Sequence, residues 1–189
     1  MLIVPPENLD WSPANLSGHG FPTHRVVTPS ASRLEFRPTA HSRRGVGVFV
    51  VLTAGIGTLL GYAVWTLDWG GIAFTCAGTL VSAWLTWLLT SLVERRIFDT
   101  EAGCYWSART IRERSVPPAD AVPLADLRGL QIISEEVETT RMSWTAYELN
   151  LVLVDGRRVN VVDHVGFEQI RAEAAQLGDF LQLPVWTRR

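Results

Sequence analysis

Apolar and polar positions follow three different patterns along the chain. From Val46 to Val93 apolar residues run almost without interruption, after Glu94 they alternate with polar residues, and before residue 32 they show no period. Long apolar runs are typical of membrane helices, and strict alternation is typical of strands with one buried face. The pattern therefore predicts a helical membrane hairpin attached to a β-rich domain.

The hairpin is assigned to residues 45–93, with spans at about 46–67 and 72–93. Each span has about 22 residues, which at 1.5 Å per residue gives about 33 Å, enough to cross a hydrocarbon core of about 30 Å. Asp68 is the only formally charged residue inside this segment and lies at the break between the spans. Neither span carries the intramembrane charge that transport paths require, so we expect an anchor.

Arginines predict the orientation of the hairpin. Arg43 and Arg44 precede the first span, Arg95 and Arg96 follow the second, and the turn between the spans has no Arg. Positive residues stay on the cytoplasmic side, so both termini are expected in the cytoplasm. The same four side chains could contact anionic head groups, although fixing the topology is the simpler role.

Small residues at four-residue spacing predict where the two spans pack against each other. The alternative is that small residues are simply frequent in membrane helices. The predicted packing positions are Gly57, Gly61, Ala73, Ala77, Gly78 and Ser82.

The segment 1–32 mixes Pro, Gly, Ser and Asn with scattered apolar residues and is predicted to be irregular. The segment 33–44 begins with alternating residues, Leu34 and Phe36 being apolar, and is expected to form a short strand before the membrane. We hypothesise that this strand pairs with the sheet of the domain from across the anchor.

The segment 94–189 is predicted to form a cytoplasmic α+β domain. Alternating runs around Gly103, after residue 127 and around Asp155-Gly156 predict antiparallel strands. A three-residue turn ending at Gly156 pairs Leu151 with Val159 and Leu149 with Val161, which keeps one apolar face. Apolar residues at helical spacing predict an amphipathic helix after residue 166, ended by Pro184, with Val185 and Trp186 returning to the sheet.

Composition narrows the chemistry. The net charge of −2 disfavours nucleic acid as a partner, and all 17 basic residues are Arg, so Lys-dependent chemistry has no residue to perform it. The segment 94–189 carries 12 Arg against 15 Asp and Glu, so it is net acidic. Cys76 lies in an apolar run and Cys104 in the domain, which disfavours a disulfide or a metal pair. We expect no metal and no cofactor.

Two membrane helices, a strand before them and a β-rich domain ending in one helix resemble bacterial membrane proteins with a pleckstrin-homology-like domain. The ending "YELNLVLVDGRRVNVVDH…IRAEAAQLGDFLQLPVW" is also similar to a recurrent tail of small bacterial membrane proteins. The resemblance covers residues 33–189 and contains no catalytic motif. It implies a multi-pass protein of the bacterial inner membrane, with a curved antiparallel sheet or partial barrel capped by a C-terminal amphipathic helix.

Three groups of residues are candidates for function. Asp163 and His164 are a carboxylate beside an imidazole, but neighbours on a strand point to opposite faces, so a structural role is favoured over catalysis. Arg109, Arg112 and Arg114 could bind anionic lipid, as the basic loops of pleckstrin-homology relatives do. A segment between two strands is a candidate partner-binding edge or a solvated hairpin tip; its residues are Glu135, Glu136, Met142 and Trp144.

The sequence thus predicts a membrane-anchored binding or scaffold module, with the lipid bilayer and an unidentified protein as partners. No catalytic residue is assigned. The alternatives are a membrane-bound enzyme using Asp163 and His164, and an anionic-lipid sensor using Arg109, Arg112 and Arg114.

Overall fold

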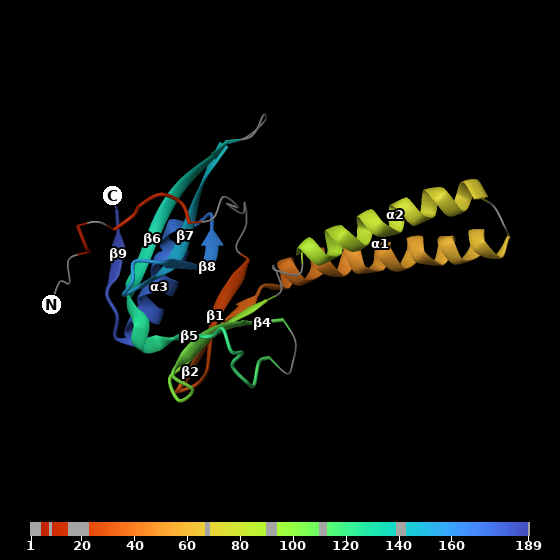
Figure 1. Ribbon diagram of the computed structural model, residues 1–189. Helices are drawn as coiled ribbons and strands as arrows, with labels where there is room; N and C mark the ends of the chain where they lie inside the picture. The colour runs from red at the N-terminus through yellow and green to blue at the C-terminus, as the bar shows by residue number, and fades with distance from the viewer. Residues whose placement is uncertain are drawn as a thin grey trace. The chain divides into compact units, whose positions relative to one another are not determined.

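The computed structural model describes residues 5–7, 9–14, 23–66, 69–89, 94–109, 113–138 and 143–188, with backbone alone at positions 41, 71, 88 and 89. The chain divides into two compact units, which we describe separately. Unit 1 combines Met1–Arg37 with Arg95–Arg189, and unit 2 is Pro38–Glu94. The fold is α+β (Figure 1).

Unit 2 consists of two helices, α1 (Ala40–Trp65) and α2 (Trp69–Leu89), which pack side by side. The hydroxyl of Thr39 caps α1 by accepting a hydrogen bond from the backbone N–H of Ser42 at 3.3 Å. Within the described residues, Ser42–Trp65 is the helical stretch long and apolar enough to cross a membrane, and Ile72–Trp87 is a shorter apolar stretch. Length and composition alone are weak evidence of a membrane span.

The contact between α1 and α2 uses part of the predicted set of small residues. The Gly78 position faces Ile56, whose Cγ2 would lie 3.4 Å from an added Cβ, and the hydroxyl of Ser82 lies 2.6 Å from that of Thr53. An added Cβ at Gly57 or Gly61 would meet no described heavy atom within 4 Å. These two glycines therefore make no close contact with α2 in the described residues, and their predicted packing role stays a prediction.

Ala73 and Ala77 are both exposed, although Ala77 lines a groove together with Phe49 and Ile56 of α1. Hydroxyl groups form the closest contacts between the two helices that we describe, because the Thr53 hydroxyl lies near that of Ser82 and 3.1 Å from that of Thr86. In an apolar surrounding such hydrogen bonds between helices stabilise the pair modestly, by about 1 kcal/mol each.

The first sheet of unit 1 has five strands in the order β1-β2-β3-β4-β5. Their bounds are β1 His24–Ser30, β2 Arg33–Pro38, β3 Arg95–Asp99, β4 Cys104–Ala108 and β5 Val122–Pro123. β3 and β4 form the predicted hairpin, with Gly103 at φ +68° in its turn, a conformation that favours glycine.

Two expectations for the N-terminal part have opposite outcomes. β2 pairs antiparallel with β3, with Leu34 opposite Phe98, so the hypothesis that this strand joins the sheet from across the helices is confirmed. The prediction of an irregular segment 1–32 is wrong for His24–Ser30, which form β1 beside β2. The apolar Val26 contacts the core there, but its short run is interrupted by Pro29 and gave no clear alternation.

The second sheet has four strands in the order β8-β7-β6-β9, and only β9 is parallel to its neighbour. After a short 3₁₀ turn, η2 (Leu124–Asp126), come β6 (Leu127–Glu138), β7 (Ser143–Leu153), β8 (Arg158–His164), helix α3 (Phe167–Leu181) and β9 (Val185–Thr187). The predicted C-terminal helix and the return of Val185 and Trp186 to the sheet are confirmed.

The turn between β7 and β8 has the predicted three-residue form. Gly156 adopts φ +86°, and Leu151 pairs with Val159. Leu149 pairs with Val162 instead of Val161, because a register shift inserts one residue into β8. This β-bulge explains why Leu149 pairs with a different residue than predicted. Beyond the bulge, the pairing register of β8 is shifted by one residue.

One hydrophobic core joins both sheets to α3. Leu34, Phe36 and Phe98 come from the first sheet, and Leu149 and Leu177 from the second sheet and the helix, all at most 1% exposed. The expectation of one antiparallel sheet or partial barrel is corrected: in the described part of the chain the strands form two separate sheets with one parallel edge strand and close no barrel. The parallel strand arises because α3 carries the chain back along β6.

Candidate functional site

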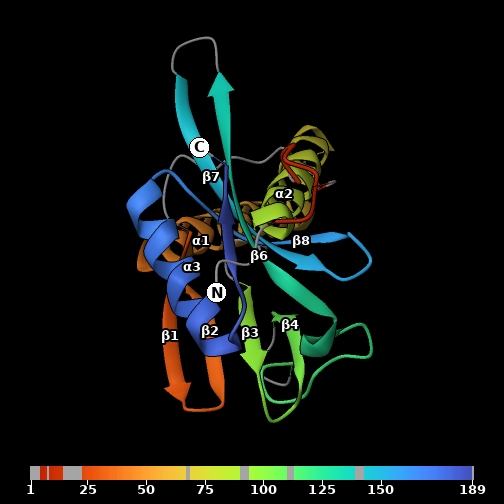
Figure 2. The same cartoon turned by 90° about the vertical axis from the view of Figure 1, so that its left-hand side faces the viewer.

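The β6–β7 hairpin continues past its neighbouring strands and forms an arm, defined here as Ile133–Glu138 and Ser143–Ala146 (Figure 2). β9 pairs with β6 only as far as Ile132, and β8 pairs with β7 only from Tyr147 onward. Among the described residues, no further strand pairs with either edge of the arm. Open edges present unpaired backbone N–H and C=O groups, which can bind another strand.

The predicted partner-binding residues lie in the arm, although in its strands instead of in a loop. Glu135 and Glu136 belong to β6, Trp144 belongs to β7 opposite Val137, and Met142 lies outside the described residues. Glu136 is exposed, whereas Glu135 is half-buried. Burial raises the pKa of Glu135, and the neighbouring charge of Glu148 raises it further.

Below the arm, the outer face of the second sheet carries an unusual set of buried polar side chains. Gln131, Glu148 and Asn150 are each 0% exposed, and the face also holds Asn160 and Asp163. Asn150 Nδ2 donates to Glu148 Oε2 at 3.1 Å, and Asn160 Nδ2 donates to Asp163 Oδ1 at 2.8 Å. We call these five residues the polar face.

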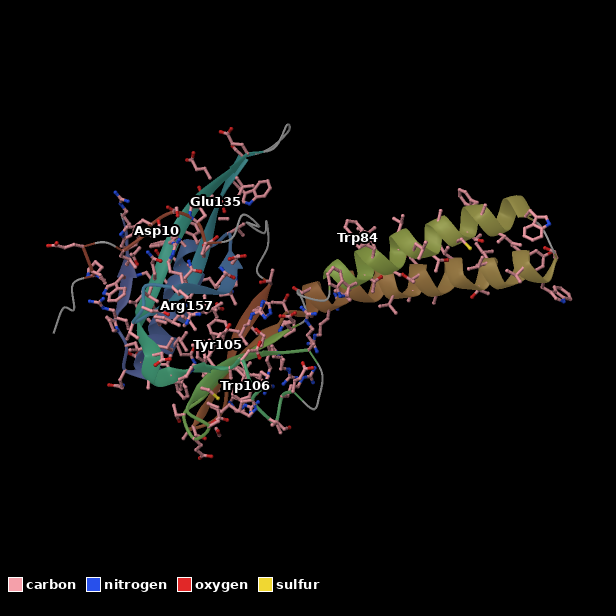
Figure 3. All side chains as sticks on the ribbon, viewed as in Figure 1. Asp10, Trp84, Tyr105, Trp106, Glu135 and Arg157 are labelled. Atoms are coloured by element: carbon pink, nitrogen blue, oxygen red, sulfur yellow. The ribbon has the colours of Figure 1, made fainter. Side chains whose placement is uncertain are left out.

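The N-terminal segment 9–14 lies on the polar face and contributes to its burial. Gln131 Nε2 donates to the carbonyl of Asp10 at 2.8 Å, and the backbone N–H of Ala14 donates to Glu148 Oε2 at 2.9 Å. Arg158 donates to the Asp10 carboxylate at 2.7 Å and to the Ser12 carbonyl at 2.6 Å. Asp10 and Glu135 are labelled in Figure 3.

Asp163 and His164 point to opposite sides of β8, as the alternation predicts. Asp163 faces Asn160, whereas His164 lies in the core with Nε2 at 2.7 Å from Glu173 Oε2 of α3. Burial raises the pKa of Asp163 to about 6, the charges of Glu148 and Glu135 raise it as well, and Asn160 and His164 oppose the rise. His164 is 0% exposed, so this pair presents no joint catalytic surface.

The arginines predicted to contact lipid do not form one group. Arg43 and Arg44 are exposed on the first turns of α1. Arg96 donates to the Ser107 hydroxyl and the Val161 carbonyl, and the backbone N–H of Arg109 donates to the Glu113 carboxylate. Arg112 lies outside the described residues.

A different arginine cluster surrounds Glu35 on the outer face of the first sheet. Glu35 accepts hydrogen bonds from Arg33 at 2.8 Å, from Arg37 at 2.7 Å and from Arg95 at 3.1 Å. Arg33 also donates to the carbonyl of Arg114 and lies 5.5 Å from the ring centroid of Trp106.

Burial and the neighbouring charges shift the pKa values of Glu35 and Arg95 in this cluster. Burial alone would raise the pKa of Glu35, but the hydrogen bonds and charges of Arg37 and Arg33 outweigh it and hold the pKa below its usual value. Burial lowers the pKa of Arg95, and the nearby charge of Arg114 lowers it further. Two arginines of the predicted lipid-contact set, Arg95 and Arg114, thus lie close together in this cluster. The sequence analysis missed Arg33 and Arg37, because it interpreted them only as the polar positions of an amphipathic strand.

The described residues contain no group of three His, Cys, Asp or Glu side chains arranged to hold a metal ion. Cys76 and Cys104 are free thiols in different units. Of the polar face, sequence reasoning singled out Asp163 alone, since the other residues alternate with core residues as on an ordinary solvated side of the strands.

Comparison with protein-family models, with curated proteins and with solved structures finds no match to this chain. The functional interpretation therefore rests on the geometry of the arm, the polar face and the arginine cluster.

Proposed function

We propose that the protein is a membrane-anchored binding module in which unit 1 engages another protein through the β6–β7 arm. The observation that carries this proposal is the open edge on each side of the arm, at Ile133–Glu138 and Ser143–Ala146. A partner strand added to such an edge gains main-chain hydrogen bonds, and the side chains of the arm select it. The acidic residues Glu135, Glu136 and Glu138 favour a partner segment that carries positive charge.

In this proposal α1 and α2 form a transmembrane hairpin in a bacterial inner membrane, with both termini in the cytoplasm. Large apolar side chains are exposed on both helices, among them Leu59 and Phe74. Trp84, also exposed, is labelled in Figure 3. Exposing this much apolar surface to water is unfavourable, whereas contact with the hydrocarbon chains of a lipid bilayer is favourable. The arginines on either side of the two helices support the orientation. A pleckstrin-homology-like fold for unit 1 remains part of this proposal, supported by the C-terminal helix that closes the core.

The test is site-specific photo-crosslinking in the full-length chain within its native membrane. A photoreactive residue replaces Glu136 in the arm, and the matched control replaces Asp155, which is also exposed but lies in the turn at the opposite end of β7. We expect one discrete crosslinked protein from position 136 that is absent from position 155 and is reduced by Glu135→Arg. The same products from both positions, or no product from position 136, would contradict the proposal.

A second candidate function is binding of anionic lipid by the arginine cluster around Glu35. Arg37 lies three residues before α1 begins, so the chain holds it within about 10 Å of that helix. Three arginines, Arg33, Arg37 and Arg95, contact the single carboxylate of Glu35, so the cluster carries net positive charge. If α1 enters the bilayer, we expect the reconstituted protein to enrich phosphatidylglycerol around itself. Arg37→Ala should lower this enrichment, and the exposed Arg157→Ala should not.

A further inference from the structure

The polar face of the second sheet has the character of a ligand-binding surface that the chain covers with its own N-terminal segment. In β6 and β7, side chains toward the core are apolar, whereas Gln131, Glu148 and Asn150 on the other side are polar and yet 0% exposed. Strands that alternate in this way normally present the polar side to water or to a ligand. The burial of this side comes from chain that lies over it.

Segment 9–14 is held on the polar face mainly through its backbone. Gln131 donates to the carbonyl of Asp10, Glu148 accepts from the N–H of Ala14, and Arg158 donates to the carbonyl of Ser12. Contacts of this kind recognise an extended chain of almost any sequence. The ion pair between Arg158 and the Asp10 carboxylate, at 2.7 Å, adds a preference for one acidic side chain.

The fit of this segment is incomplete in two ways. Within the described part of the chain no hydrogen bond reaches Gln131 Oε1 or Glu135 Oε2, although both atoms are buried. A buried acceptor without a donor destabilises the folded state, because it has lost its hydrogen bonds to water. In addition, a cavity of about 240 Å³ remains beside Trp11, lined by Ile133, Ser134 and Arg188. A ligand that donates to these acceptors and fills the cavity gains contacts that segment 9–14 does not make.

The segment is also held weakly enough to be displaced. Asp10, Ser12 and Ala14 are exposed, so the attachment buries little of their surface. Each hydrogen bond of this type contributes little, because water competes for the same groups, and the exposed ion pair is weakened by solvent screening. Segments held by a few such contacts open locally without unfolding of the domain.

We infer that the polar face is a peptide-binding site that segment 9–14 occupies in cis as an internal competitor. The ligand in trans is an extended segment of another protein, with an acidic side chain for Arg158 and a hydrogen-bond donor for Gln131 Oε1. This inference does not depend on the membrane anchor, since it uses only contacts within unit 1, and it shares Ile133, Ser134 and Glu135 with the base of the arm.

The test uses the full-length protein and a fluorescent peptide with the sequence of residues 5–14 as the probe. In the intact chain the tethered segment competes at an effective concentration on the order of millimolar. Asp10→Ala removes its ion pair with Arg158, so we expect the probe to bind this variant about fivefold more tightly than the unsubstituted chain. Binding is measured by fluorescence anisotropy.

Two controls make the outcome decisive. In the Asp10→Ala chain, adding Arg158→Ala should abolish probe binding, whereas adding Arg157→Ala should not, because Arg157 pairs with Asp155 in the turn. A probe whose own aspartate is replaced by alanine should bind about fivefold more weakly, and this comparison leaves the protein unchanged. Equal probe affinity for the unsubstituted and Asp10→Ala chains, or equal affinity of the two probes, would overturn the inference.

Discussion

Neighbouring residues of β7 are equally buried on the two faces of the second sheet but differ in chemistry. Leu149 and Leu151 point into the core under α3, while Glu148 and Asn150 on the same strand point outward, and all four are 0% exposed. The inner face is buried because apolar side chains leave water. The outer face is buried because other chain lies on it, and its polar groups must then find partners there. Equal burial therefore arises from different causes and predicts different responses to substitution.

The largest expected effect separates the two faces directly. Leu149→Ala leaves a cavity in the core and should lower the free energy of unfolding by about 2–5 kcal/mol. Asn150→Ala on the outer face removes a hydrogen bond to Glu148 and should cost only about 1–2 kcal/mol. Denaturant unfolding followed by near-ultraviolet circular dichroism measures both. Equal losses from the two variants would show that the faces are not distinguished in this way.

A second substitution on the outer face should increase stability. The folded protein raises the pKa of Asp163 from 3.8 to about 6, so the folded state holds this proton where the unfolded state has released it. The resulting stability is present below about pH 4 and is lost as pH rises toward 6, a loss of about 3 kcal/mol.

Asp163→Asn removes this titrating group while keeping an oxygen that accepts from Asn160. At pH 7 the variant should therefore be more stable than the unsubstituted protein, and the difference should shrink as pH falls to 4. The midpoint of denaturant unfolding, measured at several pH values in both proteins, gives this difference. A constant difference across this range would contradict the assignment of the pKa to Asp163.

A smaller effect is expected from the packing of the edge strand β9 against β6. An added Cβ at Gly129 would lie 2.6 Å from the Trp186 ring, which is 4% exposed, so the indole would have to move. Gly129→Ala should lower the free energy of unfolding by about 1–3 kcal/mol. Trp186→Leu should relieve the clash, so the double variant should lose less than the sum of the two single losses.

The smallest expected effect concerns segment 9–14 alone. Arg158→Ala removes its contacts to Asp10 and Ser12, so the amide of Ala14 should exchange with solvent about five times faster, while core amides keep their protection. Arg157→Ala is the matched control and should leave the exchange of Ala14 unchanged. Hydrogen exchange read by mass spectrometry of the N-terminal peptide provides the measurement. Unchanged exchange after Arg158→Ala would show that the segment is held by other contacts.

The sequence by itself determined those strands and helices that bury a face of apolar side chains. Alternation and turn residues predicted the hairpins at Gly103 and Gly156, and helical spacing predicted α3, because local chemistry decides each of them. The pairing of β2 with β3 was also predictable, since an isolated amphipathic strand requires a partner.

Only the tertiary structure decided what lies on the outer faces and edges. The polar face depends on Ala14 meeting Glu148, a contact between residues 134 positions apart that no local pattern encodes. The arginine cluster depends on Arg37 and Arg95, which the helices separate in the sequence and Glu35 brings together. Long-range polar contacts are specific to geometry, whereas apolar burial follows from residue type, and this difference explains why the core was predictable and the candidate sites were not.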